Sequence, residues 1–473
     1  MAVANCVVEQ FPAFSSFPVG QDVIYVVSNN DAVANQLKVK FVAEVHIGTT
    51  QPNLSTVTDI IGTFKTTPNN AGVGIFNLRS VLENYVKADH IASSNALFGG
   101  STSLVDLPVH LIDQFSKSTN IIRFLGIQFK VEYYDALTEN IIVGGAVNSE
   151  GFKFWNGYLK YSDIISVDVD HTSSAYLSFG FNSGIFIPFD TTRRYLTNAP
   201  TTQYANVEDY GTLAFLVLSS SSFASTNKFK ITGYTAAGSA VSGSALTRTQ
   251  QTSTGSWDSW TVEAEKLITY VGVFPANLQG SWWNTAIGNG MTHYKVQAQS
   301  SSGTAKLETI TIYINCPTTQ GYESVRLCWL NQWGAWDYYT FTQKSIRTIS
   351  TQGSTYTQLN GSWNEANYRY ANQQGGKKTF RRNATEKVTI NTDFVTENYN
   401  VMFEELMNSP EVYILQGTQA STSSGNYSYE LSQYVTPTRI LNSSFVKKTK
   451  ANDQLIQYTF EVEKSKTLRT QSI

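Results

Sequence analysis

The stretch that decides the fold is "VRLCWLNQWGAWDYYTF", residues Val325–Phe341. It holds three tryptophans, two tyrosines and a phenylalanine, and its only charged residues are Arg326 and Asp337. Gly334 supplies a turn between "VRLCWL" and "AWDYYTF", so the pattern predicts a β-hairpin.

Both faces of the second strand of this hairpin carry aromatic side chains. Trp336 and Tyr338 share one face, and Tyr339 and Phe341 share the other. A strand with one solvent face would show polar residues there, so we expect both faces to be covered. The cover is either the interior of a β-sandwich or another protein chain, because Trp and Tyr are enriched at interface cores. The candidate interface residues are Trp329, Trp333, Trp336 and Tyr339.

The composition extends this β interpretation to the whole chain. At 473 residues the chain is too long for one ordinary core, which predicts two or three domains. Charged residues make up only 15%, aromatic residues reach 13%, and neutral polar residues and glycine are abundant. Such a composition favours pleated strands joined by polar turns. We therefore predict a mainly β protein of several β-sandwich or barrel modules with a few short helices.

Three domains are expected from the order of these patterns. Residues 1–165 form an N-terminal β domain with one short helix, for which Asn77 is placed as the N-cap. Residues 166–318 form a Ser/Thr/Gly-rich β-sandwich. Residues 319–473 form a C-terminal β domain with a helix at about 396–408, ended by Pro410.

Motifs for catalysis and metal binding are missing from the sequence. The five histidines show no metal-ligand spacing, and no GxSxG nucleophile elbow is present. We therefore expect no enzyme, no catalytic residue, no cofactor and no metal site. The three cysteines, Cys6, Cys316 and Cys328, are too sparse for a disulfide framework and are expected to be free thiols.

The charge and the hydrophobic pattern bear on the cellular context. A formal net charge of −2 gives no general attraction to nucleic acid, so a nucleic-acid partner is not expected. The N-terminus "MAVANCVVEQFPAFSS" lacks the features of a secretory signal, and no apolar run approaches the roughly 20 residues that span a bilayer. We expect synthesis in a cytoplasm and no membrane contact.

A local cluster of basic residues lies in "QQGGKKTFRR", Gln373–Arg382. It lacks the spacing of a phosphate-binding loop and is predicted to be a basic loop. The loop is either a solvated turn or a contact with an acidic neighbour or a nucleic-acid backbone. We take Lys377, Lys378, Arg381 and Arg382 as candidate docking residues.

Two further pairs of tryptophans lie in segments rich in glycine and serine. Exposed indole rings in such loops can stack on the rings of sugars, although loop tryptophans also plug the ends of β-barrels. The candidate glycan-binding residues are Trp257, Trp260, Trp282 and Trp283.

Four local patterns together resemble the virion structural proteins of tailed bacteriophages, in particular tail, neck or baseplate components of phages of Bacteroidetes-type hosts. They are "GIFNLRSVLENYV", "VRLCWLNQWGAWDYYTF", "FEELMNSPEVYIL" and "LIQYTFEVEKS". The resemblance implies β modules that assemble symmetrically with other virion proteins, and no enzymatic role.

Two functions from different classes follow. The first is a non-enzymatic structural component of a phage tail or its connector, located in the virion and working through self-association and docking of other virion proteins. The alternative is a carbohydrate-binding adhesin that recognises a host surface glycan through the two tryptophan pairs. A glycan hydrolase is a third interpretation, for which no carboxylate pair is identified.

Overall fold

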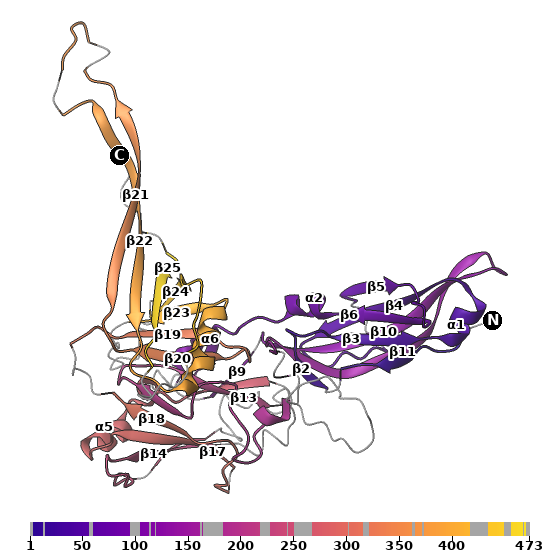
Figure 1. The fold of residues 1–473 in the computed structure, drawn as a ribbon. Helices are drawn as coiled ribbons and strands as arrows, with labels where there is room; N and C mark the ends of the chain where they lie inside the picture. The colour runs from indigo at the N-terminus through magenta and orange to yellow at the C-terminus, as the bar shows by residue number, and fades with distance from the viewer. Residues whose placement is uncertain are drawn as a thin grey trace. The chain divides into compact units, whose positions relative to one another are not determined.

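The chain forms two compact units, of which the first holds Met1–Gln203, Tyr210–Ile314 and Asn331–Asp337, and the second holds Tyr204–Asp209, Asn315–Leu330 and Tyr338–Ile473 (Figure 1). The computed structural model describes residues 3–12, 15–55, 60–94, 105–112, 115–118, 120–160, 163, 183–217, 228–243, 245–249, 267–300, 302–315, 321–361, 365–370, 373–416, 434–448, 456–466 and 468–469. The predicted fold class is confirmed, because the described residues are mainly β with several sheets and short helices.

A β-sandwich is formed by the N-terminal part of the first unit. Its smaller sheet has the order β1-β3-β6 and its larger sheet the order β2-β11-β10-β4-β5. The strands are β1 (Val7–Gln10), β2 (Ser16–Pro18), β3 (Ile24–Ser28), β4 (Leu37–Gly48), β5 (Gly62–Thr66), β6 (Val73–Asn77), β10 (Ile122–Asp135) and β11 (Asn140–Trp155). Aromatic rings join the two sheets, since Tyr25 of β3 and Phe76 of β6 both lie within 6 Å of Phe129 of β10. The core of the sandwich is therefore built from alternating inward-facing residues.

The short helix expected in this region is present but brief. Helix α2 (Arg79–Leu82) continues into the 3-10 turn η1 (Glu83–Tyr85). The predicted N-cap Asn77 is corrected to Leu78, which makes no side-chain capping hydrogen bond. Asn77 lies one residue before the cap, where its side-chain oxygen accepts a hydrogen bond from the backbone N–H of Arg79. The other helical segments of the first unit are α1 (Asn30–Asn35), η2 (Val109–Leu111), η3 (Ser183–Phe186), η6 (Pro275–Leu278) and α5 (Ser281–Gly288).

A second pair of sheets in the first unit has the orders β12-β18-β17-β14-β15 and β13-β16-β9. The strands are β9 (Phe115–Lys117), β12 (Thr202–Ala205), β13 (Thr212–Val217), β14 (Lys228–Tyr234), β15 (Leu246–Thr249), β16 (Leu267–Gly272), β17 (His293–Gln299) and β18 (Ile310–Ile314). The ring of Phe229 in β14 lies 5.8 Å from Phe215 in β13 and 5.4 Å from Phe115 in β9. A separate two-stranded sheet pairs β7 (Ile91–Ser94) with β8 (Val105–Pro108).

The expected boundary near residue 165 does not divide the chain into separate units. Strand β9 lies within the predicted N-terminal domain, yet it pairs with β16 of the predicted middle domain. The buried side chain of Asn277 also donates hydrogen bonds to the carbonyl groups of His110 and Ile112. The prediction of three domains is therefore corrected to two units, because β9 belongs to the second pair of sheets and Asn277 binds the segment just before it. The expected boundary at 318 is close to Ile314, where the chain passes into the second unit.

The second unit is organised around one sheet with the order β20-β19-β23-β24-β25-β22-β21, with β26 also paired to β22. The strands are β19 (Val325–Leu330), β20 (Trp336–Phe341), β21 (Ile346–Gln358), β22 (Gly376–Asn391), β23 (Val412–Leu415), β24 (Val435–Ile440), β25 (Thr459–Lys464) and β26 (Leu468–Arg469). The predicted hairpin of Val325–Phe341 is thus confirmed as β19 and β20. Strands β20 and β21 lie at the two ends of this strand order.

The turn of the β19–β20 hairpin depends on a glycine. Gly334 has a φ of +79°, which L side chains rarely adopt, and an added Cβ would lie 1.9 Å from the carbonyl oxygen of Asn156. The side-chain oxygen of Asn331 accepts hydrogen bonds from the backbone N–H groups of Trp333 and Ala335. Glycine and asparagine therefore fix the turn that the sequence pattern predicted.

The predicted C-terminal helix is confirmed as η7 (Glu397–Tyr399) followed by α6 (Asn400–Asn408). Phe403 of α6 is fully buried at the centre of an aromatic cluster. Its ring lies within 6.5 Å of the rings of Tyr339, Phe341, Tyr399, Tyr458 and Phe460. This cluster holds the helix against β20 and β25.

We predict that Phe403→Ala lowers the free energy of unfolding by about 3–5 kcal/mol, because it leaves a cavity among five rings. Urea denaturation followed by circular dichroism measures the change. Val401→Ala, at an exposed position of the same helix, is the matched control and should change stability by less than about 0.5 kcal/mol. Equal effects of the two substitutions would contradict the central position of Phe403.

Candidate functional site: the exposed arm of β21 and β22

The four aromatic residues predicted to contact a partner are buried inside the chain itself. Trp329 is 0% exposed, and Trp333, Trp336 and Tyr339 are each less than 9% exposed. The Trp336 indole donates to the carbonyl oxygen of Asp89 at 3.0 Å, and the Trp333 ring lies 4.8 Å from that of Phe186. The prediction that these four residues form an interface is therefore wrong, because the chain's own side chains cover them.

A charged residue of the same hairpin, Arg326, is also buried and has its partners within the second unit. Arg326 donates a hydrogen bond to the Thr340 hydroxyl at 2.7 Å and forms an ion pair with Asp209 at 3.3 Å. The Thr340 hydroxyl in turn donates to Asp209, and the Arg326 guanidinium lies 5.2 Å from the centre of the Tyr338 ring. This arrangement is a closed polar triad inside the second unit, and it stabilises the hairpin.

Strand β21 differs completely from β19 and β20, although all three belong to one sheet. Every residue of β19 and β20 is buried, whereas all 13 residues of β21 are exposed. Strand β21 pairs with β22 from Ile346↔Thr389 to Gln358↔Gly376, but β25 and β26 reach only as far as Asn383 along β22. Beyond that point no third strand of the described residues pairs with this ribbon, and Figure 1 shows the hairpin extending past the rest of its sheet. We call Gly353–Arg382 the arm.

The described residues of the arm form no core of their own. Six paired residues at about 3.3 Å each give a two-stranded ribbon about 20 Å long, followed by the tip. An isolated two-stranded ribbon is marginally stable in water. Its apolar residues are largely exposed, including Tyr356, Leu359, Tyr368, Tyr370 and Phe380. These side chains are available for contact with another molecule.

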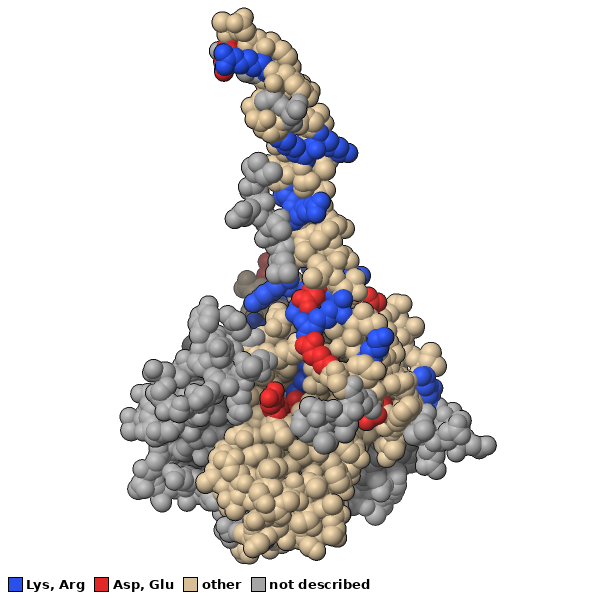
Figure 2. Space-filling view, turned by 90° about the vertical axis from the view of Figure 1, so that its left-hand side faces the viewer, with Lys and Arg blue, Asp and Glu red and all other residues tan. Residues whose placement is uncertain are grey.

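Basic side chains accompany these rings. The predicted docking residues Lys377, Lys378, Arg381 and Arg382 lie on the arm, at paired positions of strand β22. The prediction of a loop is therefore corrected to a strand, because each residue lies opposite a residue of β21 from Gly353 to Thr357. Figure 2 shows Lys and Arg side chains at intervals along the arm.

The outer edge of β21 has few of the features that prevent strand pairing. Natural edge strands are commonly protected by lysine, proline or bulges. The sequence of β21, "IRTISTQGSTYTQ", has Arg347 as its only charged residue and contains no proline, and its pairing with β22 has one register shift, between Ser354 and Thr355. Strand β21 is also the last strand of its sheet. The strand therefore offers a long edge to which a strand of another chain can pair.

The sequence missed β21 because it lacks apolar alternation. Thr, Ser and Gln occupy most of its positions, and the hydrophobic pattern that reveals half-buried strands is absent. The available signal was local: β-branched and aromatic residues flank a segment that contains Gly361, Gly375 and Gly376. This pattern is typical of a hairpin exposed on both faces.

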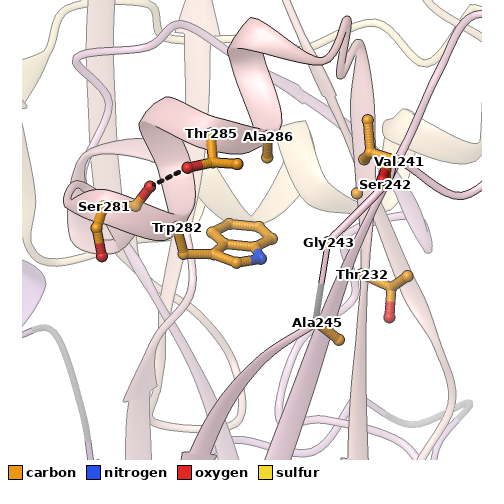
Figure 3. Close-up of a pocket in the computed structure, with 10 residues that line it drawn as sticks. Thr232, Val241, Ser242, Gly243, Ala245, Ser281, Trp282, Thr285 and Ala286 are labelled. Atoms are coloured by element: carbon orange, nitrogen blue, oxygen red, sulfur yellow. Dashed lines mark hydrogen bonds between the residues drawn. The ribbon is translucent and has the colours of Figure 1, made fainter.

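The structure describes two of the four tryptophans predicted to bind glycans. Trp257 and Trp260 lie outside the described residues. Trp283 is buried, and its ring packs edge-on against Tyr294 of β17 at 6.0 Å. Trp282 is half-buried and lines a pocket of about 290 Å³ (Figure 3). Both residues belong to helix α5, so the prediction that they lie in a loop is corrected.

The two cysteines that the structure describes are enclosed. Cys6 and Cys328 are buried thiols, as predicted, and Cys316 lies outside the described residues. Burial raises the pKa of the Cys328 thiol far above its usual range, so little thiolate forms near neutral pH. The described residues contain no group of three metal-ligating side chains. They also include no helix of the length and apolar character needed to cross a membrane.

Comparison with known proteins gives no assignment: no family model matches the chain, and no curated protein matches it.

We predict that Arg326→Met lowers the free energy of unfolding by about 3–5 kcal/mol, because Asp209 would stay buried without its cation. Denaturant titration measures the effect. Adding Asp209→Leu to the same variant should restore most of the lost stability, since the unpaired buried charge is then removed. A double variant that is as unstable as the single one would contradict a purely electrostatic origin.

Proposed function

We propose that this chain is a non-enzymatic structural component of a large symmetric assembly, in which the arm contacts a neighbouring subunit. In the form that the sequence resemblance suggests, the assembly is a phage tail or its connector, located in the virion. Self-association and docking of other virion proteins are then the activities of the chain.

One observation carries the proposal: β21 is exposed along its whole length and on both faces. In an isolated monomer, a strand of this length adds little to the free energy of unfolding, because it buries no apolar surface and leaves an unpaired edge. Both costs disappear when a second strand pairs with β21 and covers the exposed rings. The arm therefore has the properties of an element that becomes stable on assembly.

The distribution of charge favours a second copy of the chain as the neighbour. The arm contains five Lys or Arg residues and a single Glu, whereas the whole chain carries a formal net charge of −2. The residues outside the arm are therefore net acidic. A basic arm and an acidic body attract one another between copies, and such complementarity increases association rates and fixes orientation.

The second unit also offers a polar groove in which a cation could be held. It has a volume of about 410 Å³, and its acidic lining residues are Glu208, Asp209 and Glu323. Asp209 is held by Arg326, and Glu323 pairs with Arg347 at 2.5 Å, while Glu208 is exposed. A lysine or arginine from a neighbouring arm could pair with the Glu208 carboxylate in this groove.

A shortened arm tests the proposal directly. Because Ser354 pairs with Arg381, deleting residues 355–380 and joining these two positions with Asn-Gly leaves a standard two-residue hairpin. We expect the wild-type chain to form a discrete oligomer in mass photometry across a concentration series, and the shortened variant to stay monomeric. Circular dichroism should show the same fold for both, because the removed residues contribute no core.

Charge reversal distinguishes the contribution of the arm's basic side chains to assembly from that of the unpaired edge of β21. Lys377→Glu with Lys378→Glu should weaken the oligomer and make the remaining association less sensitive to salt. The matched control reverses two exposed lysines elsewhere, Lys40→Glu with Lys87→Glu, and should leave the oligomer intact. A wild-type chain that is monomeric at every concentration, or a shortened variant that assembles normally, would contradict the proposed role of the arm.

A further inference from the structure

A pocket in the first unit lies between helix α5 and the loop that joins β14 to β15 (Figure 3). Its volume of about 290 Å³ is at the lower end of the range of small-ligand pockets, about 300–1,000 Å³. Its lining residues are Thr232, Gly233, Val241, Ser242, Gly243, Ala245, Ser281, Trp282, Thr285 and Ala286. The size fits a single ring rather than an extended chain.

The single aromatic ring of the lining is held in place by its helix. In Figure 3 the Trp282 indole lies across the space between α5 and the facing loop. The next residue, Trp283, is buried against Tyr294, which anchors this turn of α5 on strand β17. The Trp282 side chain is half-buried, so one part of the ring is supported by protein and the rest borders the pocket.

The opposite wall is fixed as well. The side-chain amide of Asn289, just after α5, donates a hydrogen bond to the carbonyl oxygen of Ser242 at 2.9 Å. Gly233 lies in the floor, where an added Cβ would come within 2.6 Å of both Met291 and Val241. The pocket is therefore preorganised, since both walls are tied to the same sheet and helix.

The chemistry of the lining selects the class of ligand. Besides Trp282, the lining holds four residues with hydroxyl groups, Thr232, Ser242, Ser281 and Thr285, and the others are small or aliphatic. The Thr285 hydroxyl donates a hydrogen bond to the carbonyl oxygen of Ser281 at 2.9 Å. None of the described lining residues is charged. A flat apolar face that can rest on an indole, together with a rim of neutral hydroxyl groups, is the chemistry of a pyranose ring. A nucleotide or a charged peptide side chain would find no counter-ion in this lining.

We propose that this pocket binds one neutral sugar residue, with the ring stacked on Trp282 and its hydroxyl groups bonded to the Ser and Thr side chains. The site lies outside the arm and does not depend on the proposed assembly role. In a virion component, such a site would provide contact with a neutral surface glycan. Of the two predicted glycan-binding tryptophans that the structure describes, Trp282 lines the pocket and Trp283 is buried in the core.

Indole NMR tests the proposal on the full chain. The Trp282 N–H signal is assigned by its loss in Trp282→Phe, and the protein is titrated with glucose, galactose, mannose, N-acetylglucosamine and, as a non-sugar ring, adenosine. We expect at least one sugar to shift the Trp282 signal saturably, with a Kd of about 1–10 mM, the weak binding usual for one small ligand in a shallow site.

Variants locate the binding. Trp282→Ala should weaken the sugar affinity at least about tenfold, because the stacking surface is lost. Ile287→Ala, at an exposed position of the same helix that does not line the pocket, should keep it. The shortened-arm variant should also keep it, which separates this inference from the assembly role. Absence of a saturable shift with every sugar, a shift with adenosine alone, or undiminished affinity in Trp282→Ala would overturn the proposal.

Discussion

Burial of both faces of the β19–β20 hairpin is the constraint on which the second unit depends. A strand with aromatic residues on each face is stable only when both faces are covered, and the hairpin supplies six aromatic side chains that require cover. Phe403 and its neighbours meet this requirement for Tyr339 and Phe341. The buried triad of Arg326, Asp209 and Thr340 pairs the charge of Arg326 inside the second unit.

The same sheet then ends in a strand of the opposite kind. Strand β20, at one end of the strand order, is fully buried, whereas every residue of β21, at the other end, is exposed. The well-packed strands give the base of β22 a fixed support, since Val388 and Ile390 are buried where β25 pairs with it. A ribbon that is anchored at its base and exposed beyond it is the arrangement expected of an element that contacts a neighbouring molecule. The aromatic side chains of the β19–β20 hairpin are used in the core, so we propose that the arm makes the contact with other molecules.

The sequence predicts well whatever is governed by local pattern. The fold class, the hairpin with its turn at Gly334, and the helix around Phe403 all follow from alternation, glycine placement and helical spacing. It could not tell which atoms cover Trp329 and Trp336, because a buried strand and an interface strand have the same composition. It also missed the pairing of β9 with β16, a contact between residues 150 positions apart. The arm escaped detection because solvent on both faces removes the alternation that marks a strand.

Hydrogen–deuterium exchange of β21 as a function of protein concentration tests the central claim most directly. The backbone amides of Ile346–Gln358 are read in peptides by mass spectrometry, with those of Val325–Leu330 as the internal reference. We expect β21 to exchange rapidly in dilute protein and to become protected as the chain assembles, while β19 is protected throughout. Equal and rapid exchange of β21 in the monomer and in a demonstrated assembly would contradict this expectation.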